Sequence, residues 1–211
     1  MDDRIKVINL SKKFGDNQIL DCITMRCGRG EIVGIIGRNG CGKTVLLKCI
    51  CNLLRQDSGE IYLDGESNID YLKKQKKMGI LIESPAFLDQ YTGIENLVML
   101  YGILQSVSRE KIVSLMKHLG LDSSLKIPVS KYSLGMKQKL AIAQAIMEDQ
   151  EILLLDEPTN GLDIESVHML RNLLLELKKR GVTILLTSHS KEDIDELCDR
   201  VYCMENGSVY E

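Results

Sequence analysis

The sequence predicts an α/β fold built on a mainly parallel sheet, and two observations predict it. Residues 32–36 form an apolar run that ends at Gly37, and residues 43–54 follow it with helical spacing. Residues 165–180 have a helical pattern that ends in basic residues before a glycine, and a second apolar run, 182–187, comes next. Strands that alternate with helices in this way favour a parallel sheet covered by the helices.

Other short apolar runs extend this prediction. Residues 79–82 and 152–155 have the length of buried strands and add to the parallel sheet. The runs near the two ends of the chain are more typical of antiparallel strands. We expect a small antiparallel β layer beside the sheet, formed by residues 5–10, 59–63, 201–204 and 208–210.

The middle of the chain has a helical pattern. One helical segment covers residues 94–104, and Ser108 is placed to cap a second. The apolar face of the second segment contains Ile112, Leu115, Met116 and Leu119. No repeat, low-complexity tract or long Pro/Gly linker separates this part from the rest. We therefore expect one domain over residues 1–211, with a helical subdomain inserted at approximately 84–150.

The composition favours one sizeable core and no strong attraction to nucleic acid. The chain has 211 residues, of which 44% are hydrophobic and 27% are charged. Because charges of both signs leave a net charge of −3, the protein has no overall field that draws it onto nucleic acid or anionic lipid. We expect no nucleic-acid partner, and we expect any membrane contact to be made through another subunit.

The sequence shows neither a transmembrane helix nor a secretory signal. No apolar run reaches the length of about 20 residues that a membrane-spanning helix needs. The start, Met1-Asp2-Asp3-Arg4, lacks the basic and then apolar order of a signal peptide, which predicts a cytoplasmic protein. Its seven cysteines include no Cys-x-x-Cys pair, so we expect reduced thiols rather than zinc ligands or disulfides.

A glycine-rich motif follows the first apolar run. The eight residues fit the pattern G-x-x-x-x-G-K-[ST], and they are Gly37, Arg38, Asn39, Gly40, Cys41, Gly42, Lys43 and Thr44. Glycines let backbone N–H groups turn toward phosphates, and the helix N-terminus adds positive charge. Lys43 is placed to reach the β- and γ-phosphates, and Thr44 offers a hydroxyl to Mg²⁺. The position between a strand and a helix favours this interpretation over an ordinary glycine turn.

Two carboxylates end the apolar run 152–155. Asp156 is placed to hold the Mg²⁺ shell, and Glu157 is placed to accept a proton from an attacking water molecule. An apolar strand that ends in Asp-Glu is often only a strand that reaches solvent. The phosphate-binding motif upstream makes the chemical interpretation the better one.

Two further segments add candidate phosphate contacts. Ser133 and Gly135 lie at the N-terminus of a predicted helix, where an anion can bind, although Ser133 is equally typical of a simple N-cap. His189 follows the run 182–187 at its carboxyl end, where sheets of this kind bind ligands. We expect His189 to contact the γ-phosphate, and we expect His118 and His168 to be surface residues.

The order of these motifs resembles the ATP-binding-cassette (ABC) ATPase family over essentially the whole chain. The resemblance implies the ABC ATPase fold, with a P-loop NTPase core and ATP and Mg²⁺ as cofactors. It implies that Phe14 stacks on adenine and that residues 37–44 are the Walker A loop. It further implies that Glu157 is the catalytic base of Walker B and that Asp163 is the aspartate of the D-loop.

The resemblance also gives roles to the two candidate phosphate contacts. Residues 133–137 occupy the position of the family signature, and His189 matches the switch histidine. In this family two cassettes close head to tail, so that Ser133 and Gly135 of one complete the ATP site of the other. The expected partners are a second cassette, with a homodimer favoured, and integral membrane subunits, with the chain peripheral on the inner face of the membrane.

Two departures from the common family pattern narrow the subfamily. Glu83 stands where most members have the glutamine of the Q-loop, in Ile80-Leu81-Ile82-Glu83-Ser84-Pro85. The signature reads Ser-Leu-Gly-Met-Lys in place of Ser-Gly-Gly-Gln. Both features look like the bacitracin- and lantibiotic-resistance group and imply an exporter of antimicrobial peptides. A carboxylate at position 83 can ligate Mg²⁺ or position water, but it cannot donate a hydrogen bond as an amide does.

Two other protein classes remain as alternatives. A soluble ABC protein of translation or DNA repair usually has two cassettes or a long coiled-coil insertion, and the chain shows neither. The lysines at 73, 74, 76 and 77 are more typical of a solvated helix face than of a nucleic-acid site. A P-loop kinase of a small metabolite needs an acceptor site and a lid, and it leaves the segment 133–137 and His189 unexplained.

Overall fold

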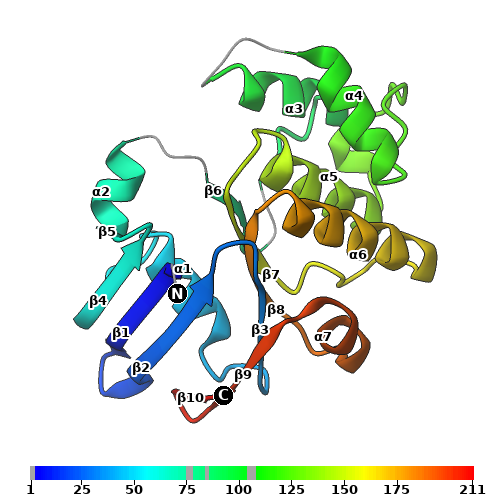
Figure 1. Ribbon diagram of the computed structural model, residues 1–211. Coiled ribbons are helices and arrows are strands. Elements are labelled where there is room, and N and C mark those ends of the chain that lie inside the picture. The colour runs from blue at the N-terminus through cyan, green and yellow to red at the C-terminus, as the bar shows by residue number, and fades with distance from the viewer. Residues whose placement is uncertain (1–2, 75–77, 84–85, 104–107) are drawn as a thin grey trace.

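The computed structural model describes residues 3–74, 78–83, 86–103 and 108–211. Its strands form two sheets, one of four strands in the order β2-β1-β4-β5 and one of six in the order β10-β9-β3-β8-β7-β6 (Figure 1). The four-stranded sheet is antiparallel and consists of β1 (Asp3–Phe14), β2 (Asn17–Gly28), β4 (Ser58–Leu63) and β5 (Glu66–Ser67). The predicted antiparallel layer is therefore present.

The six-stranded sheet carries the predicted parallel strands. Its members are β3 (Ile32–Ile36), β6 (Met78–Leu81), β7 (Ile152–Asp156), β8 (Thr183–Thr187), β9 (Arg200–Glu205) and β10 (Ser208–Tyr210). All pair in parallel except β10, which is antiparallel to β9. Along the β7–β8 pair, Leu153 lies opposite Ile184 and Asp156 lies opposite Thr187.

Two sequence-based expectations about the β layer need correction. The runs 201–204 and 208–210 belong to β9 and β10 of the main sheet and not to the antiparallel layer. In β9, Tyr202 and Met204 are buried while Cys203 is exposed, so the strand has the alternating pattern of a sheet with one covered face. Strand β2 has no counterpart in the prediction.

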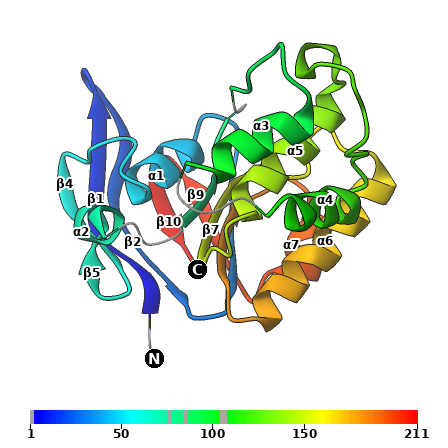
Figure 2. The same cartoon turned by 90° about the horizontal axis from the view of Figure 1, so that it is seen from above.

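The helices cover the main sheet in two layers, which Figure 2 shows from above. Helix α1 (Lys43–Ile50) lies between the two sheets, and the other face is covered by α5 (Leu134–Ile146), α6 (Ile164–Lys179) and α7 (Lys191–Leu197). The side chains of strand β7 alternate between these two layers. Ile152 and Leu154 pack in the core that contains α1, and Leu153 and Leu155 pack in the core that contains α5 and α6.

Helices α3 and α4 pack with α5 away from the antiparallel sheet. Helix α3 (Gly93–Tyr101) begins with a capping box in which Thr92 and Glu95 exchange hydrogen bonds, and Ser108 caps α4 (Arg109–His118) as predicted. The end of the predicted segment 94–104 lies outside the described residues. The remaining helical segments are α2 (Asn68–Lys73) and the 3₁₀ turn η1 (Val129–Lys131). Within the described residues, no helix is both long and apolar enough to cross a bilayer.

Candidate functional site

The glycine-rich motif wraps around the carboxyl end of β3. A side chain at Gly37 would place its Cβ 2.3 Å from the carbonyl oxygen of Met204, so only glycine fits there. Gly42 caps α1 with a φ of 112°, a left-handed conformation that glycine adopts readily. The buried Lys43 donates from Nζ to the Gly37 carbonyl oxygen at 2.8 Å. The loop therefore places a buried ammonium beside the free N–H groups of a helix N-terminus, a combination that binds phosphate.

A hydrogen-bond network joins this loop to the carboxyl ends of β7 and β8. Thr44 Oγ1 donates to Asp156 Oδ2 at 2.6 Å, and Thr187 Oγ1 donates to Asp156 Oδ1 at 2.7 Å. The backbone N–H of Glu157 in turn donates to Thr187 Oγ1 at 2.9 Å. Sequence reasoning missed Thr187, although its position as the last residue of a predicted strand was a usable signal. The network fixes a hydroxyl and a carboxylate together, and oxygen ligands of this kind suit Mg²⁺.

Glu157 follows this network in a strained and partly buried position. Its φ of 48° is left-handed, which is uncommon for a residue with a side chain. The Oε1 atom lies 2.9 Å from His189 Nε2 and 3.8 Å from Lys43 Nζ. Burial raises the pKa of Glu157, electrostatic interactions with His189 and Lys43 oppose this rise, and Asp156 adds to it. A carboxylate with a raised pKa is suited to accept a proton near neutral pH.

A cavity of about 370 Å³ opens between these groups and the end of β1. Phe14 forms one wall with 48% of its surface exposed, and Lys12 places its Nζ 5.6 Å from the ring centroid. The full lining is Phe14, Ile19, Asn39, Gly40, Gly42, Lys43, Thr44, Val45, Asp156 and Glu157. Arg38 and Cys41 line a neighbouring cavity of about 650 Å³ on the other side of the loop. The structure thus brings an exposed aromatic ring and the phosphate loop to one cavity.

Ser133, Gly135 and Asp163 are not among the residues that line this cavity. Ser133 caps α5 through a hydrogen bond from the Met136 N–H, and Asp163 caps α6. Hydrogen bonds from Ser166 hold the pKa of Asp163 below its ordinary value. A Cβ at Gly135 would lie 2.9 Å from the Gly161 carbonyl oxygen, so the start of α5 packs directly on the segment before α6. Ser133, Gly135 and Asp163 therefore lie near one another at the starts of α5 and α6, on a second surface that is separate from the cavity.

Glu83 lies at the carboxyl end of β6, beyond Leu81. Its carboxylate forms an ion pair with Lys48 of α1 at 2.5 Å, its side chain is 63% exposed, and its φ is 59°. Ser84 and Pro85, which follow in the predicted segment, lie outside the described residues. Of the three predicted metal ligands, Thr44 and Asp156 are therefore in contact, while the contact of Glu83 is with Lys48.

The structure also bears on three sequence predictions about the lysines, the cysteines and the histidines. Lys73 and Lys74 pair with Asp70 and Glu66 at 3.7 and 2.8 Å, whereas Lys76 and Lys77 lie outside the described residues. All seven cysteines are free thiols, as expected. His118 and His168 are exposed, also as expected.

The comparison with known protein families shows which family the chain belongs to. The sequence model of a family described as ABC transporter matches residues 20–160. The chain belongs to the ABC transporter family. It is an ATP-binding subunit of the ABC type.

Curated relatives and solved structures agree with the ABC assignment. An uncharacterized ABC transporter ATP-binding protein of Bacillus subtilis (strain 168), YybJ, is 43% identical over 97% of this chain and 94% of the relative. The bacitracin transport ATP-binding protein BcrA of Bacillus licheniformis is 36% identical over 98% of this chain and 68% of BcrA. The lantibiotic transport ATP-binding protein SrtF of Streptococcus pyogenes is 33% identical over 97% of this chain and 88% of SrtF.

Among solved structures, the ABC chain resembles the ATP-binding cassette MJ0796, seen as a dimer in a post-hydrolysis state bound to ADP and Pi. The TM-score is 0.89 at 25% identity, over 98% of this chain and 97% of that one. The agreement covers nearly the whole chain, so the fold prediction is confirmed.

Proposed function

We propose that this ABC subunit hydrolyses ATP at the cavity of Phe14 and Lys43 with Mg²⁺ as its metal ion. Phe14 stacks on adenine, residues 37–44 surround the phosphates, and Lys43 offsets their charge. Thr44 and Asp156 supply oxygen ligands to the metal, which when bound lowers the negative charge on the phosphate oxygens. Glu83 lies at the same end of the sheet. Once its carboxylate separates from Lys48, Glu83 ligates the metal or positions the attacking water.

The contacts of Glu157 support its role as the general base. Glu157 accepts a proton from water as the water oxygen attacks the γ-phosphorus, and the bond to the ADP oxygen breaks. His189, whose Nε2 lies 2.9 Å from Glu157 Oε1, contacts the γ-phosphate and keeps the carboxylate in place. The observation that carries this proposal lies at the carboxyl end of β7. There Asp156 accepts a hydrogen bond from Thr44 of the phosphate loop, and Glu157 lies near Lys43 of the same loop.

We infer that two copies of the cassette complete each other's ATP site. Ser133 and Gly135 lie at the exposed start of α5, away from the cavity of their own chain, as a contact with a partner's nucleotide requires. Exposed Leu134 and Ile164 lie beside them and offer apolar surface for the dimer. The dimer of MJ0796 supports this arrangement. Asp163, at the start of α6, then faces the partner.

The proposed transport activity is export of antimicrobial peptides of the bacitracin or lantibiotic type. The names of BcrA and SrtF support this substrate class. Opening and closing of the cassette dimer drives separate integral membrane subunits, and we therefore expect the chain in the cytoplasm, peripheral on the inner face of the membrane. We treat residues 1–211 as one ABC ATPase domain with a helical subdomain at approximately 84–150.

The test compares the purified chain with Glu157→Gln in Mg²⁺-dependent ATP hydrolysis, with light scattering to follow the oligomeric state. We expect turnover to fall by about 100-fold or more and the variant to accumulate as an ATP-bound dimer. Glu151→Gln, at the other end of the same strand, is the control and keeps full turnover. Normal hydrolysis by Glu157→Gln without dimer formation would contradict both the base and the composite site.

A further inference from the structure

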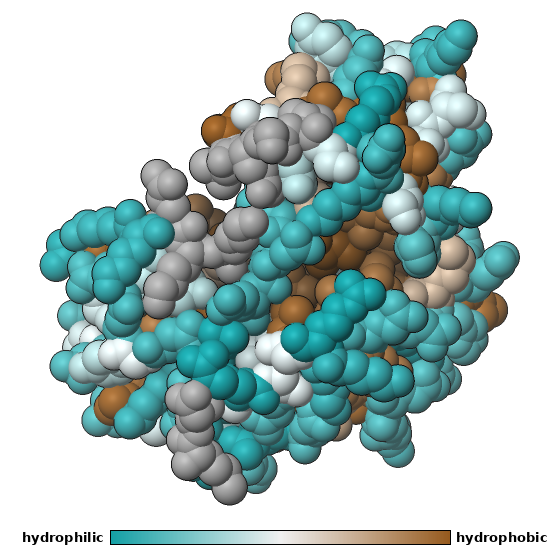
Figure 3. Space-filling model, turned by 45° about the horizontal axis from the view of Figure 1, so that its top comes forward, coloured by the Kyte–Doolittle hydropathy of each residue, from teal (hydrophilic) through white to brown (hydrophobic). Residues whose placement is uncertain are grey.

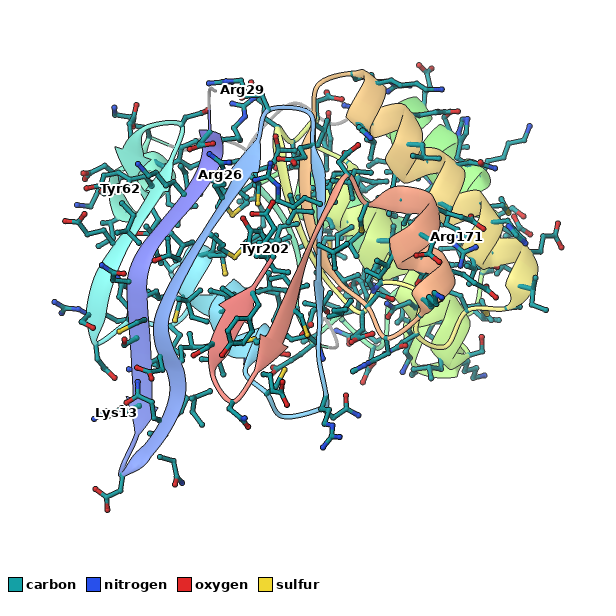
Figure 4. The ribbon with its side chains drawn as sticks, turned by 60° about the horizontal axis from the view of Figure 1, so that its bottom comes forward. Lys13, Arg26, Arg29, Tyr62, Arg171 and Tyr202 are labelled. Carbon is teal, nitrogen blue, oxygen red and sulfur yellow. The ribbon has the colours of Figure 1, made fainter. Side chains whose placement is uncertain are left out.

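A buried ion pair lies behind the nucleotide site, outside the cavity lining. Asp193 of α7 is 2% exposed, and Arg171 of α6 is 4% exposed. The guanidinium donates to Asp193 Oδ1 from Nε at 2.8 Å and from its terminal nitrogen at 2.6 Å. Figure 4 shows Arg171 where the ribbons of α6 and α7 lie side by side. Both nitrogens donate to the same oxygen, so these charged hydrogen bonds hold Oδ1 and leave Oδ2 for other partners.

The second oxygen of the same carboxylate accepts hydrogen bonds from two different loops. Thr159 Oγ1 donates to Asp193 Oδ2 at 2.8 Å, and Ser188 Oγ donates to it at 3.0 Å. Thr159 lies in the segment between Glu157 and Asp163, and Ser188 directly precedes His189. One buried oxygen atom therefore joins the segment of the base to the segment of the histidine.

Helix α6 extends this connection to the second surface. Asp163 caps the helix by accepting from the Ser166 N–H at 2.8 Å, and Arg171 lies two turns further along the same helix. Helix α6 and the hydrogen bonds of Asp193 therefore form a continuous series of contacts from Asp163 to Ser188.

Stability alone does not account for this arrangement. A buried ion pair is often no more stabilising than apolar side chains of similar volume, because both charges lose their hydration. Arg171 also forms an ion pair with the exposed Glu196 at 3.0 Å. This second ion pair does not involve the loops of Thr159 and Ser188. The particular effect of Asp193 is the position that it gives to Thr159 and Ser188.

We propose that Asp193, oriented by Arg171, is a positioning residue that couples the Asp163 segment to His189. The proposal rests on the proposed ATPase function and deepens it. Loss of the coupling misplaces the histidine and the base, and a misplacement of about 1 Å lowers a rate about 100-fold. Nucleotide binding stays unchanged because neither residue lines the cavity.

The first test removes the hydroxyls without disturbing the ion pair. We expect Thr159→Val and Ser188→Ala each to lower kcat by about 10-fold, with the affinity for a fluorescent ATP analogue unchanged. The double variant is expected to lose less than the product of the two, since both hydroxyls act through one oxygen. Glu196→Gln, which also removes a partner of Arg171, is the matched control and keeps kcat. The coupling would be contradicted if the losses in kcat multiplied in the double variant and the affinity for the analogue also fell.

The second test replaces the charged pair with an apolar one, Arg171→Met with Asp193→Leu, so that no single buried charge is left unpaired. We expect a folded protein that binds the analogue as the wild type does and turns over ATP about 10- to 100-fold more slowly. Wild-type turnover in this folded variant overturns the inference, as does loss of folding together with unchanged kcat in the hydroxyl variants. If the wild-type chain itself hydrolyses no ATP, the proposed function fails first.

Discussion

The two ends of the six-stranded sheet carry different kinds of side chain. At the carboxyl ends of β7 and β8, Asp156 and Thr187 form a polar network with the phosphate loop. At the opposite ends, a cavity of about 530 Å³ lies between α4 and α6, and Leu153 and Val182 are part of its lining. Figure 3 shows apolar side chains, in brown, inside a hollow of this face. Both ends belong to the same buried strands.

The carboxylates at the two ends also differ in their partners. At the apolar end, Asp64 and Glu151 both pair with the guanidinium of Arg4, at 2.5 and 2.8 Å. At the polar end, Asp156 accepts hydrogen bonds from two hydroxyl groups. Asp64 and Glu151 thus share one guanidinium, whereas Asp156 is held by neutral hydroxyl donors, an arrangement that suits a cation site. The difference supports the proposal that the carboxyl ends of β7 and β8 carry the metal and the nucleotide.

The largest effect is expected at the phosphate loop. Lys43→Met removes the buried ammonium, and we expect the ATP affinity to fall by about 100-fold, the effect of losing one partner of a buried charged contact. Lys111→Met at the apolar end removes an ammonium that pairs with Asp149 and is the control. Titration with a fluorescent ATP analogue measures both. Equal affinities for the two variants would remove the distinction between the ends.

A pair of threonines in β8 tests the comparison within one strand. Thr187 and Thr183 are both 0% exposed, and Thr183 donates to the Gly28 carbonyl oxygen at 2.9 Å. We expect valine at either position to lower the free energy of unfolding by about 1–3 kcal/mol. Only Thr187→Val is expected to lower turnover, by about 10- to 100-fold, and Thr187→Ser restores it. Denaturant unfolding and phosphate release separate the two effects, and a turnover loss in Thr183→Val would contradict the assignment.

A smaller effect is expected at the ion pair of Glu83 and Lys48. Glu83→Gln changes turnover by about fivefold or less if it acts only through this pair, because exposed ion pairs are worth about 1 kcal/mol at most. Lys48→Gln removes the same pair and is the matched variant. Turnover is measured against Mg²⁺ concentration. Equal changes in the two variants assign the effect to the ion pair, and a change confined to Glu83→Gln assigns it to the metal or the water.

The raised pKa of Glu157 has a consequence for stability. Burial disfavours the ionised carboxylate in the folded state, so the wild type loses stability as pH rises from about 4.5, the ordinary value, through the raised pKa. Glu157→Gln has no such loss. We therefore expect its melting temperature to exceed that of the wild type by a small margin that grows over this pH range and then stays constant. A margin that shrinks with rising pH would contradict the direction of the pKa shift.

The smallest effect is expected in the apolar cavity. Ser114 is an exposed residue of α4 that lines this cavity. Ser114→Leu places apolar atoms in it, and we expect a gain of about 0.5–1 kcal/mol in the free energy of unfolding with unchanged turnover. Ser114→Ala is the control for helix propensity. A change in turnover that Ser114→Ala does not share would show that this end also affects hydrolysis.

The sequence predicted the parts of the site that are local in the chain. The strand, glycine loop and helix around residues 32–50 follow one another, so their pattern was sufficient. Strand β9 was misplaced because its one covered face gives it the alternation of an antiparallel strand. Thr187 and the pair of Arg171 and Asp193 were missed because their contacts join residues at least 22 positions apart. Spacing along the chain does not report such contacts.

The register of β7 against β8 has a consequence for biosynthesis. A slip by one residue moves every side chain to the other face of the sheet, which separates Asp156 from Thr187 and removes the proposed nucleotide site. A ligand that binds only the correctly paired sheet stabilises it in proportion to the logarithm of its concentration. The nucleotide that this chain consumes is thus also expected to favour its correctly folded form during synthesis.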